Sequence, residues 1–391
     1  MLFSVQGSRT FSILSYNNNN RSNTKHVLKQ RKVVPPLPAM NGGDGDLSYS
    51  QNSAYQRGAV EAAEEIIKSE VVKQFSVKKL CGFPTQTSFR IADFGCSTGP
   101  NTFLAVQIII NAIIKKLETE SQNSKLPEFQ VFFNDNVFND FNTLFSSLPP
   151  ERNYYASGVP GSFYIPLFPK ASLHFAHSSS ALCWLSELPK EITDRSSRAW
   201  NKGKISYTES KEEVFEAYSG QFCRDFERFL NARADELVSG GLMELLVPGV
   251  PDYLDQSHST TASEIDLLGS CLMDMANNGK FDESMVDEFN MPLYYTHPKE
   301  LKGLLENNKN FSIERMEILH NSAKHVTMPD PESRAMYFRA TLEQVLVKHF
   351  PAEIMDELFD RYADKIADSS LYLKPDVQRS IFIFVLLKRL D

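Results

Sequence analysis

Short apolar runs alternate along this chain with longer stretches whose hydrophobic residues follow helical spacing. The apolar runs, which are typical of buried strands, occupy residues 91–94, 129–133, 172–178 and 242–249. The stretches with helical periodicity occupy about residues 54–75, 101–118 and 222–238. Strands that alternate with helices predict an α/β fold, in which a mainly parallel sheet carries helices on both faces.

The C-terminal third of the chain changes to a mostly helical pattern. Helical spacing covers residues 263–308 and 329–366, and the closing segment QRSIFIFVLLKR predicts a last strand of the sheet. Residues 186–220 are polar and charged, as expected of an insertion, and SGVPGSFYIPLFP is predicted to be a loop. We therefore expect one domain over residues 40–391, with helical cap segments at about 186–220 and 260–366 above the strand ends.

Residues 1–39 differ in composition from the rest. They carry six lysines and arginines, no aspartate or glutamate, and end in VVPPLP, which predicts a disordered basic extension. Serine- and arginine-rich, acid-poor ends are also typical of organelle transit peptides. The alternative is a dispensable extension with Met40 as a second start. We expect a cytoplasmic protein, or an organellar one if this extension is a targeting signal.

Composition narrows the function classes. The 391 residues are 42% hydrophobic and carry a formal net charge of −8, which argues against a nucleic-acid surface. The five cysteines are scattered and form no C-x-x-C pair, so neither a zinc site nor a disulfide framework is expected. No apolar run approaches the length of a transmembrane helix, so no membrane partner is expected.

The segment RIADFGCSTGPNT, residues 90–102, predicts a strand, a tight glycine turn and a helix with a proline near its start. Its glycines read G-x-x-x-G and no lysine follows, so it is neither a dinucleotide fingerprint nor a P-loop. Asp93 on the turn favours a cofactor with a cationic amine, and Asp135 after the next strand favours ribose hydroxyls. S-adenosylmethionine has both groups. The alternative is an ordinary turn between a strand and a helix.

Eight blocks together resemble the SABATH family of plant methyltransferases, which use S-adenosylmethionine to methylate small carboxylic acids or, in the caffeine branch, ring nitrogens. They run in family order over about nine-tenths of the chain: MNGGDGDLSYSQNSAYQR, IADFGCSTGPNT, FFNDNVFNDFNTLF, GVPGSFY, LHFAHSSSALCWLSELP, WNKGKI, ARADELVSGGLM and DEFNMPLY. The resemblance implies a Rossmann-like class I methyltransferase sheet, a carboxyl O-methyltransferase activity and a homodimer.

The resemblance also implies roles for individual residues. Positions that match the cofactor site are Tyr49, Ser53, Asp93, Cys96, Asn101, Asp135, Asn136, Ser162 and Phe163, to which we add Ser179 at the end of a strand. Positions that match the substrate site are Gln56, Ser180, Cys183, Trp184, Phe338 and Thr341. Positions assigned to Mg²⁺ in some members are Asn201, Asp287, Phe289 and Asn290, for which a structural loop contact is the alternative.

Two departures stand out. Salicylate-type members carry a bulky aromatic residue and a methionine where this chain has Ser180 and Cys183, so we expect a wider pocket. Glu244 lies within the apolar strand LMELLVPG, where a buried unpaired carboxylate would be costly, so it must be paired, exposed or functional.

The expected chemistry needs no general base, because a carboxylic acid with a pKa of about 4 is already ionised at neutral pH. Gln56 and Trp184 would orient the substrate carboxylate as N–H donors, which makes them the expected catalytic residues. His174 and His177 lie in a strand and are expected to be structural. Two alternatives remain: N-methylation of a heterocycle, and a catalytically silent protein that only binds the cofactor.

Overall fold

The computed structural model of the chain describes residues 39–75, 88–120, 126–255, 259–319, 330–369 and 380–391. Its strands are β1 (Ser88–Phe94), β2 (Glu128–Asp135), β3 (Tyr154–Pro160), β4 (Leu173–Ser179), β5 (Leu237–Gly249), β6 (Phe311–Leu319) and β7 (Ile381–Arg389). Its α-helices are α1 (Tyr49–Asn52), α2 (Ala54–Gln74), α4 (Asn101–Glu120), α5 (Phe141–Ser146), α6 (Glu212–Glu236), α7 (Thr260–Asn277), α8 (Ser284–Glu288), α9 (Pro298–Asn307), α11 (Pro331–Leu346) and α12 (Met355–Ser369). Short 3₁₀ helices lie at Lys190–Ile192 and Ala352–Ile354.

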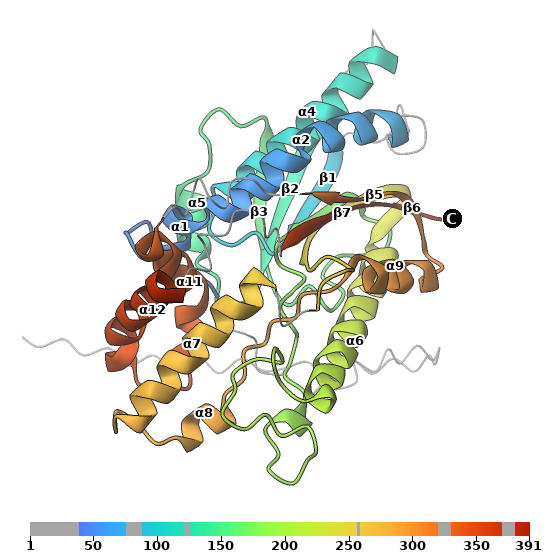
Figure 1. Cartoon of the computed structure of the whole chain (residues 1–391). Coiled ribbons are helices and arrows are strands. Elements are labelled where there is room, and N and C mark those ends of the chain that lie inside the picture. Colours follow the sequence, from blue (N-terminus) through green and yellow to red (C-terminus); the bar gives the residue numbers. More distant parts are fainter. Residues whose placement is uncertain (1–38, 76–87, 121–125, 256–258, 320–329, 370–379) are drawn as a thin grey trace, which may run out of the picture. The chain divides into compact units, whose positions relative to one another are not determined.

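The seven strands form one mixed sheet in the order β3-β2-β1-β4-β5-β7-β6 (Figure 1). The strands β3, β2, β1, β4 and β5 pair in parallel, whereas β7 is antiparallel to both of its neighbours. The predicted mainly parallel sheet and the predicted final strand are both confirmed. Successive strands are added to one side of β1 up to β3 and to its other side from β4 on. In such sheets the ligand usually binds at the carboxyl ends of the strands where the order of addition changes, here β1 and β4.

Helices cover both faces of the sheet, as predicted. On one face α2 and α4 lie side by side (Figure 1), and their apolar residues share a core with Ile91, Val131 and Phe175 of the strands. On the other face α6 and α9 pack against Phe94, Met243 and neighbouring strand residues. A third hydrophobic cluster joins α7, α11 and α12 to Cys183, which follows the carboxyl end of β4. No helix in the described ranges is long and apolar enough to cross a membrane.

Three sequence predictions about the elements were wrong. Residues 157–160 belong to strand β3, an edge strand whose terminal Pro160 needs no ladder hydrogen bond. Phe311–Leu319 is strand β6, at the other edge, although it lies inside the range predicted as helical cap. The predicted segment 186–220 has no α-helix before Glu212, where α6 begins ten residues earlier than predicted because Val214 and Tyr218 continue its buried face.

The expectation for residues 1–39 concerns residues that, apart from Ala39, lie outside the described ranges. The described chain is fixed soon after: the backbone N–H of Asn41 donates to the carbonyl of Ala340 at 2.9 Å, and its side-chain amide donates to Glu343 at 2.7 Å. Asn41 therefore ties the start of the described chain to α11.

We predict that a chain beginning at Met40 keeps its melting temperature and its turnover, because the contacts of Asn41 remain intact. Asn41→Ala in the full chain is the matched control, and it should lower stability by about 1 kcal/mol through loss of buried hydrogen bonds. Thermal melts and turnover assays of the three proteins check this. Loss of cooperative melting on removal of residues 1–39 would show that they belong to the fold.

Candidate active site

The glycine turn after β1 lies against the segment that follows β4. Gly95 has a φ of +91°, and a Cβ at this position would lie 2.2 Å from the Cβ of Ala181, so only glycine allows this approach. The N–H groups of Gly95 and Cys96 donate to the carbonyl of Asn134 at 2.8 and 3.0 Å. These contacts lock the turn between the ends of β2 and β4.

Asp93, near the end of β1, is almost fully buried and accepts a hydrogen bond from the hydroxyl of Thr102 in the first turn of α4. Burial is the largest influence on its carboxyl group and raises its pKa, whereas the neighbouring His177 lowers that pKa. A buried carboxylate at the mouth of a glycine turn is suited to a cationic partner.

Asp135, the last residue of β2, faces the same turn. Its Oδ2 accepts the N–H of Ser97 at 2.8 Å, and its Oδ1 accepts the backbone and side-chain N–H groups of Asn136 at 2.7 and 3.1 Å. Burial nevertheless raises its pKa to about 6. The carboxylate is thus held in one orientation, and Oδ2 keeps capacity for further donors.

The other predicted cofactor residues gather around these two acids. The side-chain amide of Asn101, at the start of α4, donates to both the carbonyl and the hydroxyl of Ser53 at 3.0 Å. Burial raises the pKa of the Tyr49 hydroxyl, and the carboxylates of Asp135 and Asp93 raise it further. Burial also raises the pKa of the Cys96 thiol, and the same two carboxylates raise it further. Elements that are distant in sequence therefore meet at one site.

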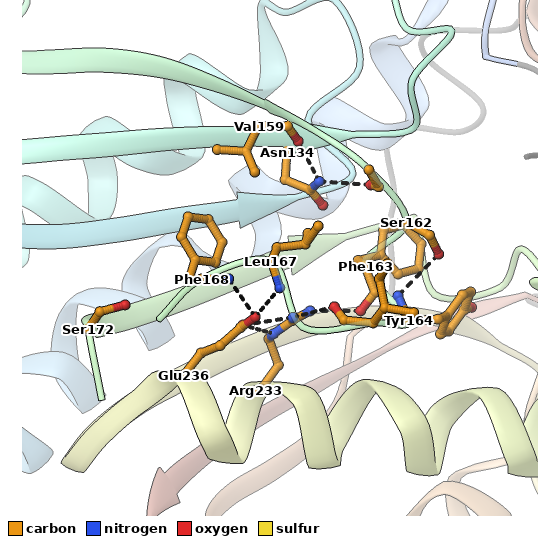
Figure 2. Close-up of polar contacts among 12 residues, drawn as sticks. Asn134, Val159, Ser162, Phe163, Tyr164, Leu167, Phe168, Ser172, Arg233 and Glu236 are labelled. Atoms are coloured by element: carbon orange, nitrogen blue, oxygen red, sulfur yellow. Dashed lines mark hydrogen bonds and ion pairs between the residues drawn. The ribbon is translucent and has the colours of Figure 1, made fainter. Parts of the chain in front are cut away.

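Ser162 and Phe163 lie on a loop that α6 holds in place (Figure 2). The guanidinium of Arg233, which is fully buried, donates to the carbonyl of Phe163 at 2.8 Å and pairs with Glu236 at 2.7 Å. Glu236 in turn accepts the N–H of Phe168 at 2.9 Å. Sequence reasoning missed both positioning residues, although they lie in the block ARADELVSGGLM that carried the family resemblance.

The predicted substrate residues meet at the border between the sheet and the cap. The Nε2 of Gln56, in α2, donates to the hydroxyl of Tyr337 in α11 at 3.5 Å, and its Oε1 is buried without a hydrogen-bond partner among the described residues. Trp184 is half-buried, and no acceptor for its indole N–H is found within the described ranges. Its carbonyl accepts the hydroxyl of Tyr164 at 2.5 Å, which fixes its backbone. Both side chains thus retain unused polar atoms.

The segment between Ser179 and Trp184 contains one strained residue. Ser180 adopts a φ of +61°, which costs energy in a residue with a side chain, and its N–H donates to Leu246 at 3.0 Å. Ser179, at the end of β4, lies within 3.5 Å of the Ser180 hydroxyl. Burial raises the pKa of Cys183 to about 12, so this thiol is neutral. Tyr295 and Tyr337, which sequence reasoning missed, interact electrostatically with Cys183; Tyr295 lies just after the family block DEFNMPLY.

Phe338 and Thr341 have the contacts of structural residues. Phe338 packs edge-on against Tyr362 in the cluster of α7, α11 and α12. The hydroxyl of Thr341 donates to the carbonyls of Tyr337 and Phe338 at 2.9 and 3.1 Å. A substrate role for these two residues stays a prediction.

Neither strand histidine is a free base. His174 accepts the N–H of Arg90 at 3.0 Å, and burial lowers its pKa to about 4, so it is neutral. His177 shares a hydrogen bond with Glu244, and both side chains are buried. These contacts agree with the structural role predicted for them, and Glu244 is therefore paired.

The residues predicted to bind Mg²⁺ come together, but their contacts are with one another and with neighbouring loop residues. The amide of Asn201 donates to Asn290 at 2.7 Å and its oxygen accepts the hydroxyl of Ser210 at 2.8 Å. Asp287 accepts the N–H of Gly203 at 2.8 Å, and Phe289 packs against Phe350. Mg²⁺ needs a near-octahedral set of oxygens. The side-chain oxygens of Asn201 and Asn290 and one carboxylate oxygen of Asp287 already accept protein hydrogen bonds, which leaves too few free oxygens for an octahedral magnesium site. The contacts therefore favour the structural alternative.

Residues 36–390 match the family model described as SAM dependent carboxyl methyltransferase. A loganic acid O-methyltransferase from Catharanthus roseus is 44% identical over 363 residues, which is 91% of this chain and 97% of that protein. This chain belongs to the SABATH family of S-adenosylmethionine-dependent carboxyl methyltransferases. The family also includes an N-methyltransferase branch: a 3,7-dimethylxanthine N-methyltransferase from Camellia sinensis var. assamica is 34% identical over 90% of this chain and 96% of that protein.

A solved structure described as loganic acid methyltransferase with SAH superposes on this SABATH chain with a TM-score of 0.86, covering 90% of this chain and 99% of the other. At 44% identity, this match confirms the Rossmann-like class I methyltransferase fold. A farnesoic acid carboxyl-O-methyltransferase from Arabidopsis thaliana is 42% identical over 83% of this chain and 91% of that protein. Relatives in this SABATH family thus act on different acids.

Proposed function

We propose that this enzyme transfers the methyl group of S-adenosylmethionine to the carboxylate of a small-molecule acid, giving a methyl ester and S-adenosylhomocysteine. The observation that carries the proposal is a pair of N–H groups: the indole N–H of Trp184 has no acceptor among the described residues, and the amide of Gln56 makes only a long hydrogen bond of 3.5 Å to Tyr337. No described residue beside them is a free base. Two N–H donors without a base suit a nucleophile that is already ionised, such as a carboxylate.

The reaction balances without proton transfer. One carboxylate oxygen forms a bond to the methyl carbon as the bond from that carbon to the sulfonium sulfur breaks, and the electron pair stays on sulfur. The negative carboxylate and the positive sulfonium become a neutral ester and a neutral thioether. Catalysis then consists of in-line positioning and exclusion of water, and positioning alone can supply about 7 kcal/mol or more.

The cofactor would occupy the space between the ends of β1, β2 and β4. Asp93 would receive its cationic amine, and Asp135 would accept bonds from the ribose hydroxyls through its remaining acceptor positions. Phe163, on the loop fixed by Arg233, would lie against the adenine. Tyr49, Ser53 and Asn101 would close the site from the side of α1 and α4, and Cys96, Asn136, Ser162 and Ser179 would line it.

The substrate would be an acid larger than a simple benzoic acid. Ser180 and Cys183 take little space, and relatives of this chain are named for loganic and farnesoic acids, which are larger than salicylate. The hydroxyls of Tyr295 and Tyr337, which act electrostatically on Cys183, add polar character to this region. Together these features support an acid with an extended or cyclic carbon skeleton.

N-methylation of a xanthine is the second candidate, supported by the similarity to a xanthine N-methyltransferase. A ring N–H must lose a proton, but no base is at hand to take it. Cys183 is a neutral thiol, the pKa of His174 is lowered, and His177 is hydrogen-bonded to Glu244. Mg²⁺ has no step in the proposed chemistry. The homodimer stays a prediction of the family resemblance.

Methyl transfer from radiolabelled S-adenosylmethionine to a panel of acids and xanthines tests this function. We expect labelled ester from bulky iridoid or terpenoid acids, with at least tenfold lower turnover on salicylate and none on xanthines. Methylation of xanthines alone would establish the N-methyltransferase. Cofactor binding by calorimetry without transfer to any acceptor would instead support the silent binding protein.

A further inference from the structure

Three ionisable residues form a row across the middle of the sheet. Asp93 of β1 pairs in register with His177 of β4, and His177 pairs in register with Glu244 of β5. Residues in register on parallel strands point to the same face. This is the face covered by α2 and α4, whose apolar side chains complete the surrounding core. All three side chains are at most 3% exposed, so their charges act on one another with little screening by water.

The contacts within the row are specific. The Nδ1 of His177 hydrogen-bonds the Oε2 of Glu244, whereas Oε1 of Glu244 is buried without a partner among the described residues. Asp93 accepts its hydrogen bond from Thr102 of α4. The titratable groups that act on Asp93 and His177 belong to the row itself, while Tyr49 of α1, Tyr55 of α2 and Cys96 of the glycine turn stay neutral because burial raises their pKa.

The row therefore contains two acids and one base. Burial lowers the pKa of His177, but Glu244 and then Asp93 outweigh that effect and raise it to about 9. An imidazolium between two carboxylates leaves one net negative charge. Without Glu244, the imidazolium would have Asp93 as its sole counterion, and the two charges would cancel. A cationic ligand would then meet a neutral pair instead of a carboxylate.

We propose that Glu244 and His177 are positioning residues for the cofactor: Glu244 neutralises the imidazolium of His177, which leaves the Asp93 carboxylate available to the cationic amine. This inference rests on the proposed role of Asp93 in cofactor binding. It also gives a function to Glu244, an acid in an otherwise apolar strand.

Comparing the binding of two ligands measures the contribution of the cationic amine. S-adenosylhomocysteine carries the amino-acid group, whereas 5′-methylthioadenosine lacks it, so the ratio of their affinities cancels the contribution of Asp135 to the adenosine half. In the wild-type protein, the affinity for S-adenosylhomocysteine divided by the affinity for 5′-methylthioadenosine should stay constant within about twofold from pH 6.5 to 8.5, because the row keeps its charge. In Glu244→Gln, binding of the amine must displace the proton of His177, so the ratio should rise by up to about tenfold per pH unit below the new pKa of His177.

Three variants make the result specific. His177→Gln combined with Glu244→Gln removes both partners, and it should restore a flat ratio because Asp93 alone remains. Asp266→Asn, which removes a carboxylate that accepts hydroxyl hydrogen bonds in α7, is the matched control and should keep the wild-type profile. Asp93→Asn should weaken binding of S-adenosylhomocysteine but not of 5′-methylthioadenosine. If it does not, the proposed role of Asp93 is wrong.

A flat ratio in Glu244→Gln, together with a selective loss in Asp93→Asn, would overturn the inference and leave the proposed function intact. If Glu244→Gln does not fold, histidine-labelled wild-type protein provides the test by NMR, with the double variant assigning the His177 signal. An imidazolium that persists from pH 6.5 to 8.5 is expected. A neutral His177 at pH 7 would overturn the inference.

Discussion

Replacing Asp135 with alanine is expected to weaken S-adenosylmethionine binding by about 2–3 kcal/mol, or about 30- to 150-fold, because charge-assisted hydrogen bonds to the ribose are lost. Asp135→Asn keeps the volume and should lose nearly as much. Calorimetric titration of the folded variants measures the effect. Asp140→Asn is the matched control, because Asp140 caps α5 and accepts the N–H of Gly43, and it is not among the predicted cofactor residues.

The same residue predicts a pH dependence. Burial raises the pKa of Asp135 from 3.8 to about 6 in the empty enzyme, and the ribose hydroxyls donate to its ionised form. Cofactor affinity should therefore be full above pH 6 and fall as pH drops below 6, because binding then requires loss of a proton. Asp135→Asn should lack this decline. Unchanged affinity in a folded Asp135→Ala protein would exclude the ribose assignment.

Removing the donors to the substrate carboxylate should be the second large effect. Trp184→Phe keeps the aromatic bulk but removes the indole N–H, and this should cost about 1.5–3 kcal/mol, roughly ten- to a hundredfold in kcat. Gln56→Leu should cost a similar amount. The double variant should lose less than the sum, because both donors hold one group. The other tryptophan supplies a control: Trp200→Phe removes an indole N–H between β4 and α6, outside the predicted cofactor and substrate residues, and should leave turnover unchanged.

The pH profile of turnover distinguishes this mechanism from base catalysis. If the substrate enters as a carboxylate, the acid limb should move with the pKa of each acid tested. This limb must be read from kcat at saturating cofactor, because Asp135 affects cofactor binding near pH 6. A limb that stays near pH 6.5 for every acid would indicate a histidine base, and the proposed mechanism would then be wrong.

The sequence by itself determined the parts of this protein that depend on local pattern. Strand, glycine turn and helix at residues 90–102 follow from apolar spacing and from residues whose backbone preferences are strong, and the structure has them at β1 and α4. The family resemblance needed only the order of short blocks, and the family and fold that it implied are confirmed. Asp93 and Asp135 could be identified because each lies at or next to the end of a strand.

The tertiary structure decided what depends on pairing between distant segments. The edge strands β3 and β6 are partly exposed and lack continuous apolar runs, so part of β3 was predicted as a loop and β6 was not distinguished from the helical cap around it. Arg233 reaches the loop of Phe163 across 70 residues of sequence, and Glu244 meets His177 across 67. A charged residue in an apolar run shows that a partner is needed. Which partner it finds is set by strand order and register, and these are fixed only when the whole sheet has formed.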